Sequence, residues 1–544
     1  MSASENAASI IIDTLVQLGV EKFFLAPGYR STPLVFAVEN HPKTISNVFF
    51  DERALGFMAL GYAKAKNRPC AIITTSGSAL ANLYPSVVEA AKNHVPLILL
   101  TADRPYEMLD SEQNQTIEQQ NFFTPYTCYT LNLPAFDNSI DANYLSSSLS
   151  NAIFQGIKHK GPVQINCSFR KPFHAEGPSL LPKTKALTFS IPTLTPSSKT
   201  IETLAIQCEN KQGVIILGKL PEMTNLTPIF NLAKILKWPI LADPQSPLYK
   251  YKKSDEVISR FELILTSLGS FQANYILQFG NRFVSAALLE WIKEQNATYT
   301  HITPYRSFYD PIRKITHKIE ADPALTATRL SENISPSKTS LIPFLKERDH
   351  HIEKTLEEHF SKDEYFSEKN ILYRLAKTLE PNTNLFIANS TPIRNFLEVF
   401  LPKNPLNVFT NRGASGIDGN ISTAIGIHLA KKTKTIAIVG DQAALHDLNA
   451  FAYANIKNLH FLIFNNSGGG IFSTLPLAKN KPIFERYFQA KHTFTFSKIA
   501  EQFSLSYQNI KTFDELEELS INSLPTIIEI TTSNEINLLC QKKL

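Results

Sequence analysis

Two stretches decide the fold of this 544-residue chain: Ile438-Val439-Gly440-Asp441 and, one helix length later, Phe464-Asn465-Asn466-Ser467-Gly468. Their order is typical of strand, Gly-Asp, helix, strand, Asn-Asn. It brings a carboxylate and an amide to the carboxyl ends of two strands, where open α/β sheets bind ligands. Asp441, the side-chain oxygen of Asn466 and the carbonyl of Gly468 offer three oxygens to Mg²⁺, which keeps the rest of its shell for waters and phosphates. Mn²⁺ accepts the same oxygen set.

Composition narrows the class of protein. The chain has 43% hydrophobic residues, 54 basic and 49 acidic residues and a net charge of +5. The length predicts about three domains, and the absence of dense basic blocks argues against nucleic acid or anionic membrane as partner. Five scattered cysteines without a Cys-x-x-Cys pair argue against a disulfide framework or a zinc site. With no signal peptide and no integral membrane segment in the sequence, we expect a cytoplasmic protein.

Short β-rich runs alternate with helical patterns along most of the chain, which predicts parallel sheets. A Pro- and Ser-rich stretch at residues 177–200 marks a linker, and a charged helix-like stretch, Phe344–Phe360, leads into the last region. We therefore expect three α/β domains, at residues 1–180, 181–350 and 351–544. The expected strands are Lys22–Ala26, Cys70–Thr75, Leu97–Ala102, Gly213–Leu217, Tyr275–Phe279, Tyr299–Thr303, Leu385–Ala388, Thr435–Val439, Phe461–Phe464 and Thr526–Ile530. One expected helix covers Ala79–Ala91.

A second motif, Asp51-Glu52-Arg53, stands where a β-like run ends and a helix rich in small residues begins. One interpretation is a plain helix start, since acidic residues favour the positive end of the helix dipole. The other is functional: close packing of the small residues would keep the Glu52 carboxyl poorly solvated and raise its pKa. Neither interpretation excludes the other.

A third motif is the glycine-rich run Asn411–Asn420, with the sequence Asn-Arg-Gly-Ala-Ser-Gly-Ile-Asp-Gly-Asn, which precedes an expected helix at Ile421–Leu429. Glycines let a backbone approach a ligand closely, and amides at a helix start receive anionic oxygens. A tight strand-to-helix connection explains the run equally well when it is considered alone.

Six segments occur in order that together carry a specific resemblance. They are Ala26–Leu34 (Ala-Pro-Gly-Tyr-Arg-Ser-Thr-Pro-Leu), Asp51–Arg53, Thr75–Ala79 (Thr-Ser-Gly-Ser-Ala), Thr101–Pro105 (Thr-Ala-Asp-Arg-Pro), Asn411–Gly419 and Asn465–Pro476. The chain resembles the 2-succinyl-5-enolpyruvyl-6-hydroxy-3-cyclohexene-1-carboxylate synthases, thiamine-diphosphate enzymes of menaquinone biosynthesis. The resemblance spans both outer domains, and the middle domain matches weakly.

This resemblance implies a thiamine-diphosphate-binding fold and a transferase that uses thiamine diphosphate with Mg²⁺ or Mn²⁺. The implied reaction decarboxylates 2-oxoglutarate and adds the succinyl carbanion to isochorismate. It also implies an aminopyrimidine-binding first domain and a diphosphate- and metal-binding third domain that meet across a subunit interface, in a homodimer or homotetramer. The cofactor carries the difficult chemistry, and the protein orients anions.

The substrate and catalytic residues follow from the same resemblance. Glu52 would share a proton with a ring nitrogen of the aminopyrimidine. Arginine suits carboxylates because its planar fork forms two parallel hydrogen bonds. The implied residues are Arg394 and Arg412, with Ser390, for the distal carboxylate of 2-oxoglutarate, and Arg30, Arg104 and Gln115 for isochorismate. For any one arginine, a surface salt bridge is the ordinary alternative.

The implied cofactor contacts lie mainly in the third domain. Besides Glu52 they are Ser415, Gly416, Ile417, Asp418, Gly440, Asp441, Gln442, Asn466, Gly468, Ile471 and Phe472, with Asp441, Asn466 and Gly468 on the metal. Ile417 would support the bent cofactor, and Ile471 and Phe472 would form an apolar wall. Core packing is the alternative for each of these three apolar residues.

The chain departs from the family pattern at two places. Tyr29 stands where the family usually has a small serine, next to Arg30. In the middle domain, Ser285 and Ala286 stand where the family often has basic residues, and we consider Arg282 as a substitute for the absent cation.

Two other functions remain open on the sequence. Another thiamine-diphosphate 2-oxo acid decarboxylase or carboligase would keep Glu52, Asp441 and Asn466 without needing all four arginines. A non-catalytic paralogue would tolerate the loss of Glu52 or of the metal ligands. The joint presence of these residues favours the synthase.

Overall fold

The computed structural model describes residues 2–137, 139–174, 184–251, 254–362, 365–518 and 526–543. The chain forms two compact units. The first comprises Met1–Ile191, Asn411–Lys432 and Ala443–Ala454, and the second comprises Pro192–Thr410, Thr433–Gln442 and Asn455–Leu544. Three parallel sheets in these units confirm the expected α/β class. The expected domain boundary at residue 180 lies outside the described residues, and residue 350 lies inside the long helix α12 (Ile342–Lys362).

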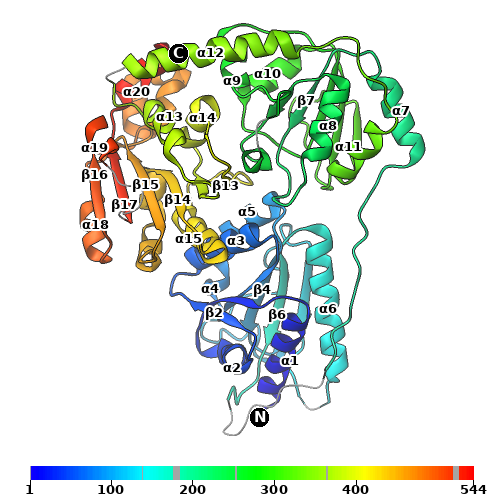
Figure 1. Ribbon diagram of the computed structural model, residues 1–544. Helices are drawn as coiled ribbons and strands as arrows, with labels where there is room; N and C mark the ends of the chain where they lie inside the picture. The colour runs from blue at the N-terminus through cyan, green and yellow to red at the C-terminus, as the bar shows by residue number, and fades with distance from the viewer. Residues whose placement is uncertain are drawn as a thin grey trace. The chain divides into compact units, whose positions relative to one another are not determined.

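The first unit is built on a six-stranded sheet in the order β2-β1-β3-β4-β6-β5, with every strand pair parallel (Figure 1). The strands are β1 (Lys22–Ala26), β2 (Ile45–Val48), β3 (Cys70–Thr74), β4 (Leu97–Asp103), β5 (Tyr129–Leu133) and β6 (Val163–Ser168). The helices are α1 (Ala3–Gln17), α2 (Thr32–Asn40), α3 (Glu52–Lys66), α4 (Ser78–Ala81), α5 (Tyr84–Asn93) and α6 (Ala142–His159).

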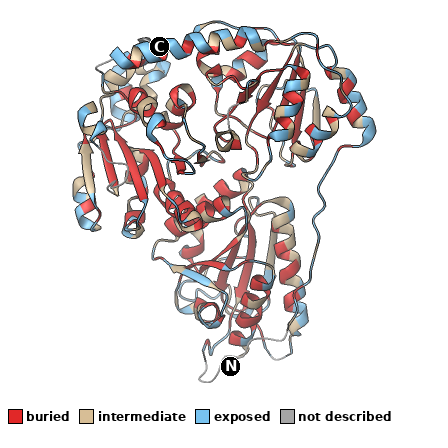
Figure 2. Cartoon of the chain, viewed as in Figure 1, coloured by how far each residue is buried: buried red, intermediate tan, exposed pale blue. Residues whose placement is uncertain are grey.

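Both faces of this sheet are covered. Side chains alternate between the faces of a strand, so Phe23 and Leu25 of β1 pack in one cluster with residues of α1, α2 and α6. On the other face, α3 packs against β1, β3 and β4. The strands β1, β3 and β4 are buried throughout (Figure 2), as sheets covered on both faces require.

The predicted helix over Ala79–Ala91 is wrong in one respect, because the segment forms two helices. Helix α4 ends at Ala81, and α5 begins at Tyr84. Pro85 stands in the first turn of α5. Proline lacks an N–H and its ring clashes with the preceding turn, so it is tolerated at a helix start and interrupts a continuous helix.

A glycine contact joins α3 to α15 (Asn420–Lys431) within the first unit. A Cβ on Gly61 would lie 2.1 Å from the carbonyl oxygen of Thr423, and one on Gly426 would lie 2.0 Å from that of Met58. Only glycine permits these two backbones to touch. The glycine-rich run that leads into α15 is therefore held beside α3 in one packed body.

The second unit contains a five-stranded sheet in the order β11-β10-β9-β7-β8. Its strands are β7 (Gly213–Leu217), β8 (Ile240–Ala242), β9 (Tyr275–Phe279), β10 (Thr298–Thr303) and β11 (His317–Glu320). One face packs on α7 (Ser198–Cys208), α8 (Thr227–Leu236) and α11 (Pro323–Ser331), and the other on α9 (Phe261–Ser267), α10 (Ala286–Glu294) and α12.

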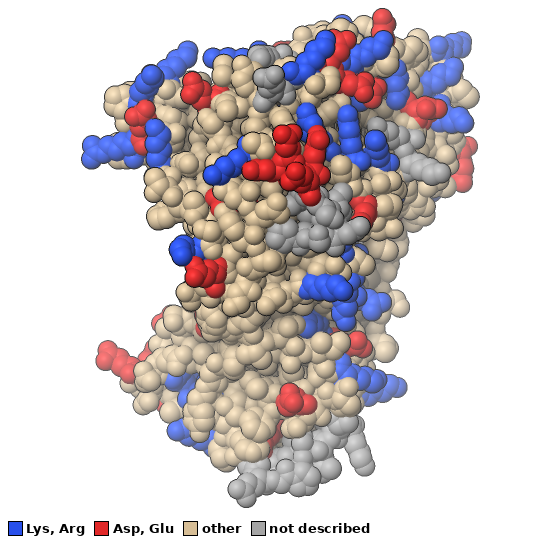
Figure 3. Space-filling model, turned by 60° about the vertical axis from the view of Figure 1, so that its left-hand side comes forward, with Lys and Arg blue, Asp and Glu red and all other residues tan. Residues whose placement is uncertain are grey.

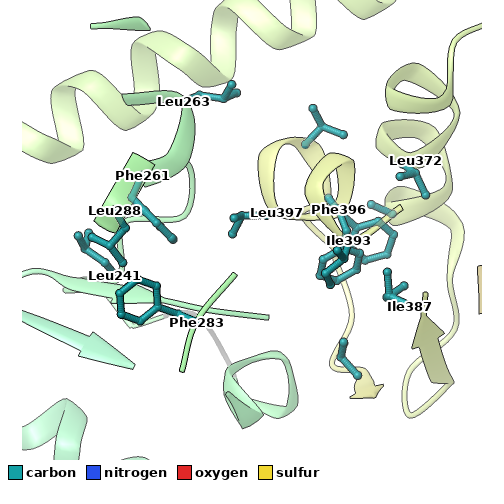
Figure 4. Close-up of a cluster of buried hydrophobic side chains, with 14 of the residues drawn as sticks. Leu241, Phe261, Leu263, Phe283, Leu288, Leu372, Ile387, Ile393, Phe396 and Leu397 are labelled. Atoms are coloured by element: carbon teal, nitrogen blue, oxygen red, sulfur yellow. The ribbon is translucent and has the colours of Figure 1, made fainter. Parts of the chain in front are cut away.

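The second sheet of this unit has the order β13-β12-β14-β15-β17-β16, which is the order of the first unit's sheet when strands are counted within each sheet. Its strands are β12 (Asn384–Ile387), β13 (Asn407–Thr410), β14 (Thr435–Gly440), β15 (Leu459–Asn465), β16 (Tyr507–Ile510) and β17 (Ile527–Thr531). The further helices are α13 (Glu368–Thr378), α14 (Thr391–Val399), α16 (Asp441–His446), α17 (Lys481–Ile483), α18 (Ser497–Gln502), α19 (Phe513–Glu517) and α20 (Asn534–Lys543). Side chains of α9 and α10 share one apolar core with those of α13, α14 and β12 (Figure 4).

All ten predicted strands are confirmed, with ends within two residues. The described residues contain no helix with the length and apolar character that crossing a membrane requires. The described part of the chain, which includes all five cysteines, contains no disulfide. On the face shown in Figure 3, basic and acidic side chains are interspersed.

Candidate functional site

Polar residues follow three neighbouring strands of the second sheet in the second unit. Ser390 comes after β12, Asp441 after β14 and Asn466 after β15. Gly440 pairs with Phe464 in the parallel register, which places the two polar ends at the same edge. The chain leaves β12 for β13 on one side and β14 on the other, and such a reversal of strand order creates a ligand-binding crevice at the carboxyl ends.

Asp441 is buried, with 4% of its surface exposed. Its Oδ1 accepts the N–H of Gln442 at 2.6 Å, and its Oδ2 accepts the N–H of Gly468 at 3.0 Å and lies 3.2 Å from Nε2 of His492. Burial raises the pKa of the Asp441 carboxyl, and these N–H groups and His492 oppose that shift. A divalent cation at this carboxylate would favour the ionised form further.

Asn466 presents an unpaired oxygen. Its Nδ2 donates to Oε1 of Glu368 at 2.8 Å, whereas its Oδ1 is buried and has no hydrogen-bond partner among the described residues. Buried polar atoms in proteins are nearly always paired. An orphaned amide oxygen beside a buried carboxylate has the chemistry of a Mg²⁺ or Mn²⁺ ligand, so the residues present fit the cation that the sequence predicts.

The loop after β15 depends on glycine. Gly468 has φ +126°, and a Cβ there would lie 2.5 Å from the carbonyl oxygen of Gln489. That carbonyl accepts the N–H of Gly469 at 2.7 Å and Nε2 of Gln442 at 3.3 Å. The short helix η5 (Gly470–Thr474) then carries Ile471 and Phe472, both half-buried. The structure thus groups the expected diphosphate and metal residues of the second unit around one loop.

Arg394 and Ser390 lie together on α14 and the turn before it. Nη1 of Arg394 donates to the carbonyl oxygen of Ser390 at 2.8 Å. Burial lowers the pKa of Arg394, and the carboxyl of Glu262 acts against that shift. Burial raises the pKa of Glu262 to about 7, because desolvation outweighs the hydrogen bond from Ser285 and the charge of Arg394. The neighbouring acid was not expected from the sequence.

The expected isochorismate residues come together in the first unit. Buried Arg104 donates through Nη1 to Oγ of Ser76 at 2.6 Å and to the carbonyl oxygen of Gln115 at 2.7 Å. Gln115 in turn donates through Nε2 to the carbonyl oxygen of Ser76 at 2.9 Å. Burial lowers the pKa of Arg30, and the nearby charge of Arg104 lowers it further. The nearby Asp103 carboxylate acts against both shifts in Arg30. Neighbouring guanidinium groups have the chemistry to bind carboxylates, and their contact with isochorismate stays a prediction.

Glu52 is the first residue of α3, and Asp51 caps that helix by accepting the N–H of Ala54 at 3.1 Å. The helix-start interpretation is therefore confirmed, and it leaves the Glu52 carboxyl free for another role. Its Oε2 accepts only a long hydrogen bond, 3.4 Å, from Nδ2 of Asn82 among the described contacts.

The glycine-rich run is held by a buried acid of α5. Glu89 accepts the N–H of Gly413 at 2.8 Å and that of Ala414 at 2.6 Å. Ile417 is 42% exposed, which argues against the core-packing interpretation for this residue. A Cβ on Gly416 would lie 1.9 Å from Oδ1 of Asp418, so a side chain there would displace that carboxylate. Arg412, Ser415 and Asp418 are carried by this same run in the first unit.

The expected site residues fall into the two compact units. Glu52, Arg30, Arg104, Gln115, Arg412 and Ser415–Asp418 belong to the first. Ser390, Arg394, Gly440–Gln442, Asn466, Gly468, Ile471 and Phe472 belong to the second. The meeting of the two groups across a subunit interface stays a prediction.

The structure also describes the surroundings of the two departures from the family pattern, Tyr29 and Ala286. Tyr29 is 72% exposed and packs edge-to-face on Phe173, with ring centroids 5.0 Å apart. The guanidinium of Arg30 stacks over the same ring at 4.7 Å. Ala286 begins α10, capped by Ser285, in the second unit, where the carbonyl of Arg282 accepts the N–H of Lys219 at 2.9 Å. The role suggested for Arg282 stays a prediction.

Four residues beside the expected site residues were not found from the sequence: Glu89 in the first unit, and Glu262, Glu368 and His492 in the second. Each acts through a partner far along the chain, such as the 98 residues between Glu368 and Asn466. In the sequence, Glu368 resembles an ordinary first-turn acid after the cap residue Ser367. The only signal for Glu368 was a capping pattern, which predicts a helix and no ligand contact.

Comparison with known proteins agrees with this geometry. Three family models match: "Thiamine pyrophosphate enzyme, N-terminal TPP binding domain" at residues 5–122, "Middle domain of thiamine pyrophosphate" at 192–387 and "Thiamine pyrophosphate enzyme, C-terminal TPP binding domain" at 394–529.

Similar curated proteins are the 2-succinyl-5-enolpyruvyl-6-hydroxy-3-cyclohexene-1-carboxylate synthases of three bacteria. The protein of Aliivibrio fischeri is 35% identical over 93% of this chain and 90% of its own length, and that of Shewanella halifaxensis is 35% identical over 96% and 94%. The protein of Chlorobium phaeobacteroides is 34% identical over 97% and 95%. The chain therefore belongs to the 2-succinyl-5-enolpyruvyl-6-hydroxy-3-cyclohexene-1-carboxylate synthase family of thiamine pyrophosphate enzymes.

Proposed function

We propose that the chain decarboxylates 2-oxoglutarate and adds the resulting succinyl group to isochorismate, as the synthase of menaquinone biosynthesis. The observation that carries this proposal is the cluster of Arg30, Arg104 and Gln115 beside Ser76. A simple 2-oxo acid decarboxylase has no second, dicarboxylate substrate and does not need that cluster. Isochorismate has two carboxylates, which match two neighbouring guanidinium groups.

The cofactor residues have distinct roles in this proposal. Thiamine diphosphate supplies an electron sink for the decarboxylation. Asp441, Asn466 and the carbonyl of Gly468 hold Mg²⁺ or Mn²⁺, which binds the diphosphate. Glu52 holds and exchanges a proton with a ring nitrogen of the aminopyrimidine. Gln442 and the run from Ser415 to Asp418 contact the cofactor, Ile417 supports its bent form, and Ile471 and Phe472 wall the pocket.

The substrate residues orient carboxylates. Arg394 and Arg412, with Ser390, hold the distal carboxylate of 2-oxoglutarate. The Arg394 guanidinium is supported by its bond to the carbonyl of Ser390 and by the charge of Glu262. Nη1 of the guanidinium group is therefore fixed by the protein, which lowers the conformational entropy that Arg394 loses when a carboxylate binds.

The proposal includes the assembly. The aminopyrimidine domain at 1–180 and the diphosphate domain at 351–544 meet across a subunit interface in a homodimer or homotetramer, with the central domain at 181–350 between them in sequence. The family membership supports this arrangement. A cytoplasmic location is part of the proposal.

Substrate kinetics of arginine variants test the proposal. The purified chain is assayed with thiamine diphosphate, Mg²⁺, 2-oxoglutarate and isochorismate. Arg394→Ala should raise the KM for 2-oxoglutarate by at least tenfold, and Arg104→Ala should do the same for isochorismate, because each loses a charge-assisted hydrogen bond worth about 1.5–3 kcal/mol. A parent enzyme that releases carbon dioxide at the same rate with and without isochorismate, and forms no adduct, refutes the synthase assignment. Inertness of the parent, with Glu52→Gln indistinguishable from it, indicates a non-catalytic paralogue.

A further inference from the structure

The acid Glu368 lies next to the proposed metal site without belonging to it. It is the first residue of α13 and is 1% exposed. Two amide nitrogens, Nδ2 of Asn466 at 2.8 Å and Nδ2 of Asn537 at 3.0 Å, donate to its Oε1, and Nδ2 of Asn395 donates to its Oε2 at 3.2 Å. All three amides turn an NH₂ group toward the oxygens of this carboxyl, so Glu368 sets the direction in which each of them points.

The contact with Glu368 determines the orientation of the Asn466 side-chain amide. Because its Nδ2 must face Glu368, its Oδ1 faces away and is the buried oxygen that has no partner among the described residues. An asparagine in the reverse orientation would offer a cation an NH₂ group, which cannot ligate it. We propose that Glu368 is a positioning residue that fixes the side-chain amide of Asn466 with its oxygen toward the divalent cation.

Glu368 is itself held in place. Asn537 of α20 donates to its Oε1 and accepts the backbone N–H of Glu368 through Oδ1 at 2.9 Å. This two-point contact fixes the carboxylate relative to its own backbone. Helix α20 therefore supports Asn466, the residue after β15, through Glu368 of α13. Hydrogen-bond partners of this kind orient metal ligands in many sites.

The neighbouring residue offers a matched control. Asn465 donates through Nδ2 to Oε1 of buried Glu529 at 2.6 Å, and Glu529 also accepts the N–H of Phe496 and the hydroxyl of Tyr507. The two Asn-Glu pairs are alike in chemistry and burial and differ in which asparagine has the orphaned oxygen. Changes at Glu529 report the cost of losing such a pair without any effect on the metal ligand.

The positioning role rests on the proposed metal ligation. The experiment distinguishes failure of the positioning role from failure of the metal ligation itself. The full chain, with saturating thiamine diphosphate, is titrated with Mg²⁺, and the rise in Tm gives the half-saturating Mg²⁺ concentration. Binding of Mn²⁺, followed by the loss of the free-ion EPR signal, gives a second measure. We expect Glu368→Ala to raise the half-saturating concentration 10- to 100-fold.

Glu368→Gln keeps the size of the side chain, so it is expected to fold if the alanine variant does not. It should raise the half-saturating Mg²⁺ concentration at least threefold, because one of the two oxygens that accept the neighbouring amides becomes an NH₂ group, which cannot accept them. Glu529→Gln should lower Tm and leave that concentration unchanged. A value for Glu368→Gln within twofold of the parent, or an equal shift in Glu529→Gln, overturns the positioning role. If Asn466→Ala also leaves the Mg²⁺ titration unchanged, the proposed metal site itself is wrong.

Discussion

The contact between Glu89 and the glycine-rich run leads to a prediction that can be worked out from the structure. Glu89 is 3% exposed and accepts the N–H groups of Gly413 and Ala414, one on each carboxylate oxygen. In Glu89→Gln, one of these oxygens becomes an NH₂ group that faces an N–H. One charge-assisted hydrogen bond, about 1.5–3 kcal/mol, is lost, and a buried N–H left unpaired costs about 1–3 kcal/mol more.

The sum is about 2.5–6 kcal/mol, a large part of the stability of an ordinary domain. At about 2 °C per kcal/mol, the lower limit predicts that the Tm of the unliganded chain falls by about 5 °C. The loosened run carries Arg412 and the cofactor residues from Ser415 to Asp418, so the KM for 2-oxoglutarate should rise at least fivefold.

Thermal unfolding followed by circular dichroism and steady-state kinetics measure the two effects. The control is Glu39→Gln, the same chemical change at an exposed position of α2 in the same unit. We expect no change in Tm or KM there. A Glu89→Gln protein with the parent's Tm and the parent's KM for 2-oxoglutarate would show that the run is not held by this acid.

Three further predictions concern Glu52, Glu262 and Arg104. Glu52→Gln should lower kcat by about 10²–10⁴-fold. It should lower Tm by no more than about 2 °C, since Glu52 makes one long contact with Asn82 and a first-turn acid contributes about 0.3–1 kcal/mol. A kcat within tenfold of the parent would exclude the proton-transfer role. Burial raises the pKa of Glu262 to about 7 from 4.5, so its ionisation destabilises the fold as pH rises from about 4.5 to 7. Glu262→Gln should therefore be more stable relative to the parent at pH 8 than at pH 4, and equal differences in Tm at both pH values would contradict this. Arg104→Lys keeps the charge and loses one arm of the fork, in which Nη1 serves Ser76 and Gln115 and Nη2 serves the carbonyl of Asn114. The KM for isochorismate should therefore rise while that for 2-oxoglutarate stays constant in the same assay.

The alternation of strands and helices was sufficient to predict the fold class. Buried parallel strands appear as continuous apolar runs such as Cys70–Thr74. Such a run can be recognised in the local sequence without knowing which residues contact it. Strands without such a run were missed: β16 is only half-buried, β8 has three residues, and β6 has polar residues among its apolar ones. The β-like run before Asp51 lies next to β2, which is mostly exposed. The break between α4 and α5 was missed because the helical pattern of the sequence continues on both sides of Pro85.

The site was predicted where a motif is local and missed where contacts are long-range. Asp441, Asn466 and Gly468 follow their strands directly, so strand order alone brings them together. Glu368 contacts Asn466 within the second unit and Glu89 contacts Gly413 within the first, through hydrogen bonds that span 98 and 324 residues of sequence. No spacing rule connects such pairs, and each acid also has an ordinary explanation as part of a helix.

The central claim is that this chain joins two substrates and does not merely decarboxylate one. The most direct measurement is the stoichiometry of a single reaction containing the full chain, thiamine diphosphate, Mg²⁺, isochorismate and ¹³C-labelled 2-oxoglutarate. We predict one molecule of adduct, carrying the labelled succinyl group, for each molecule of carbon dioxide released. Carbon dioxide released without a matching amount of labelled adduct would contradict the account.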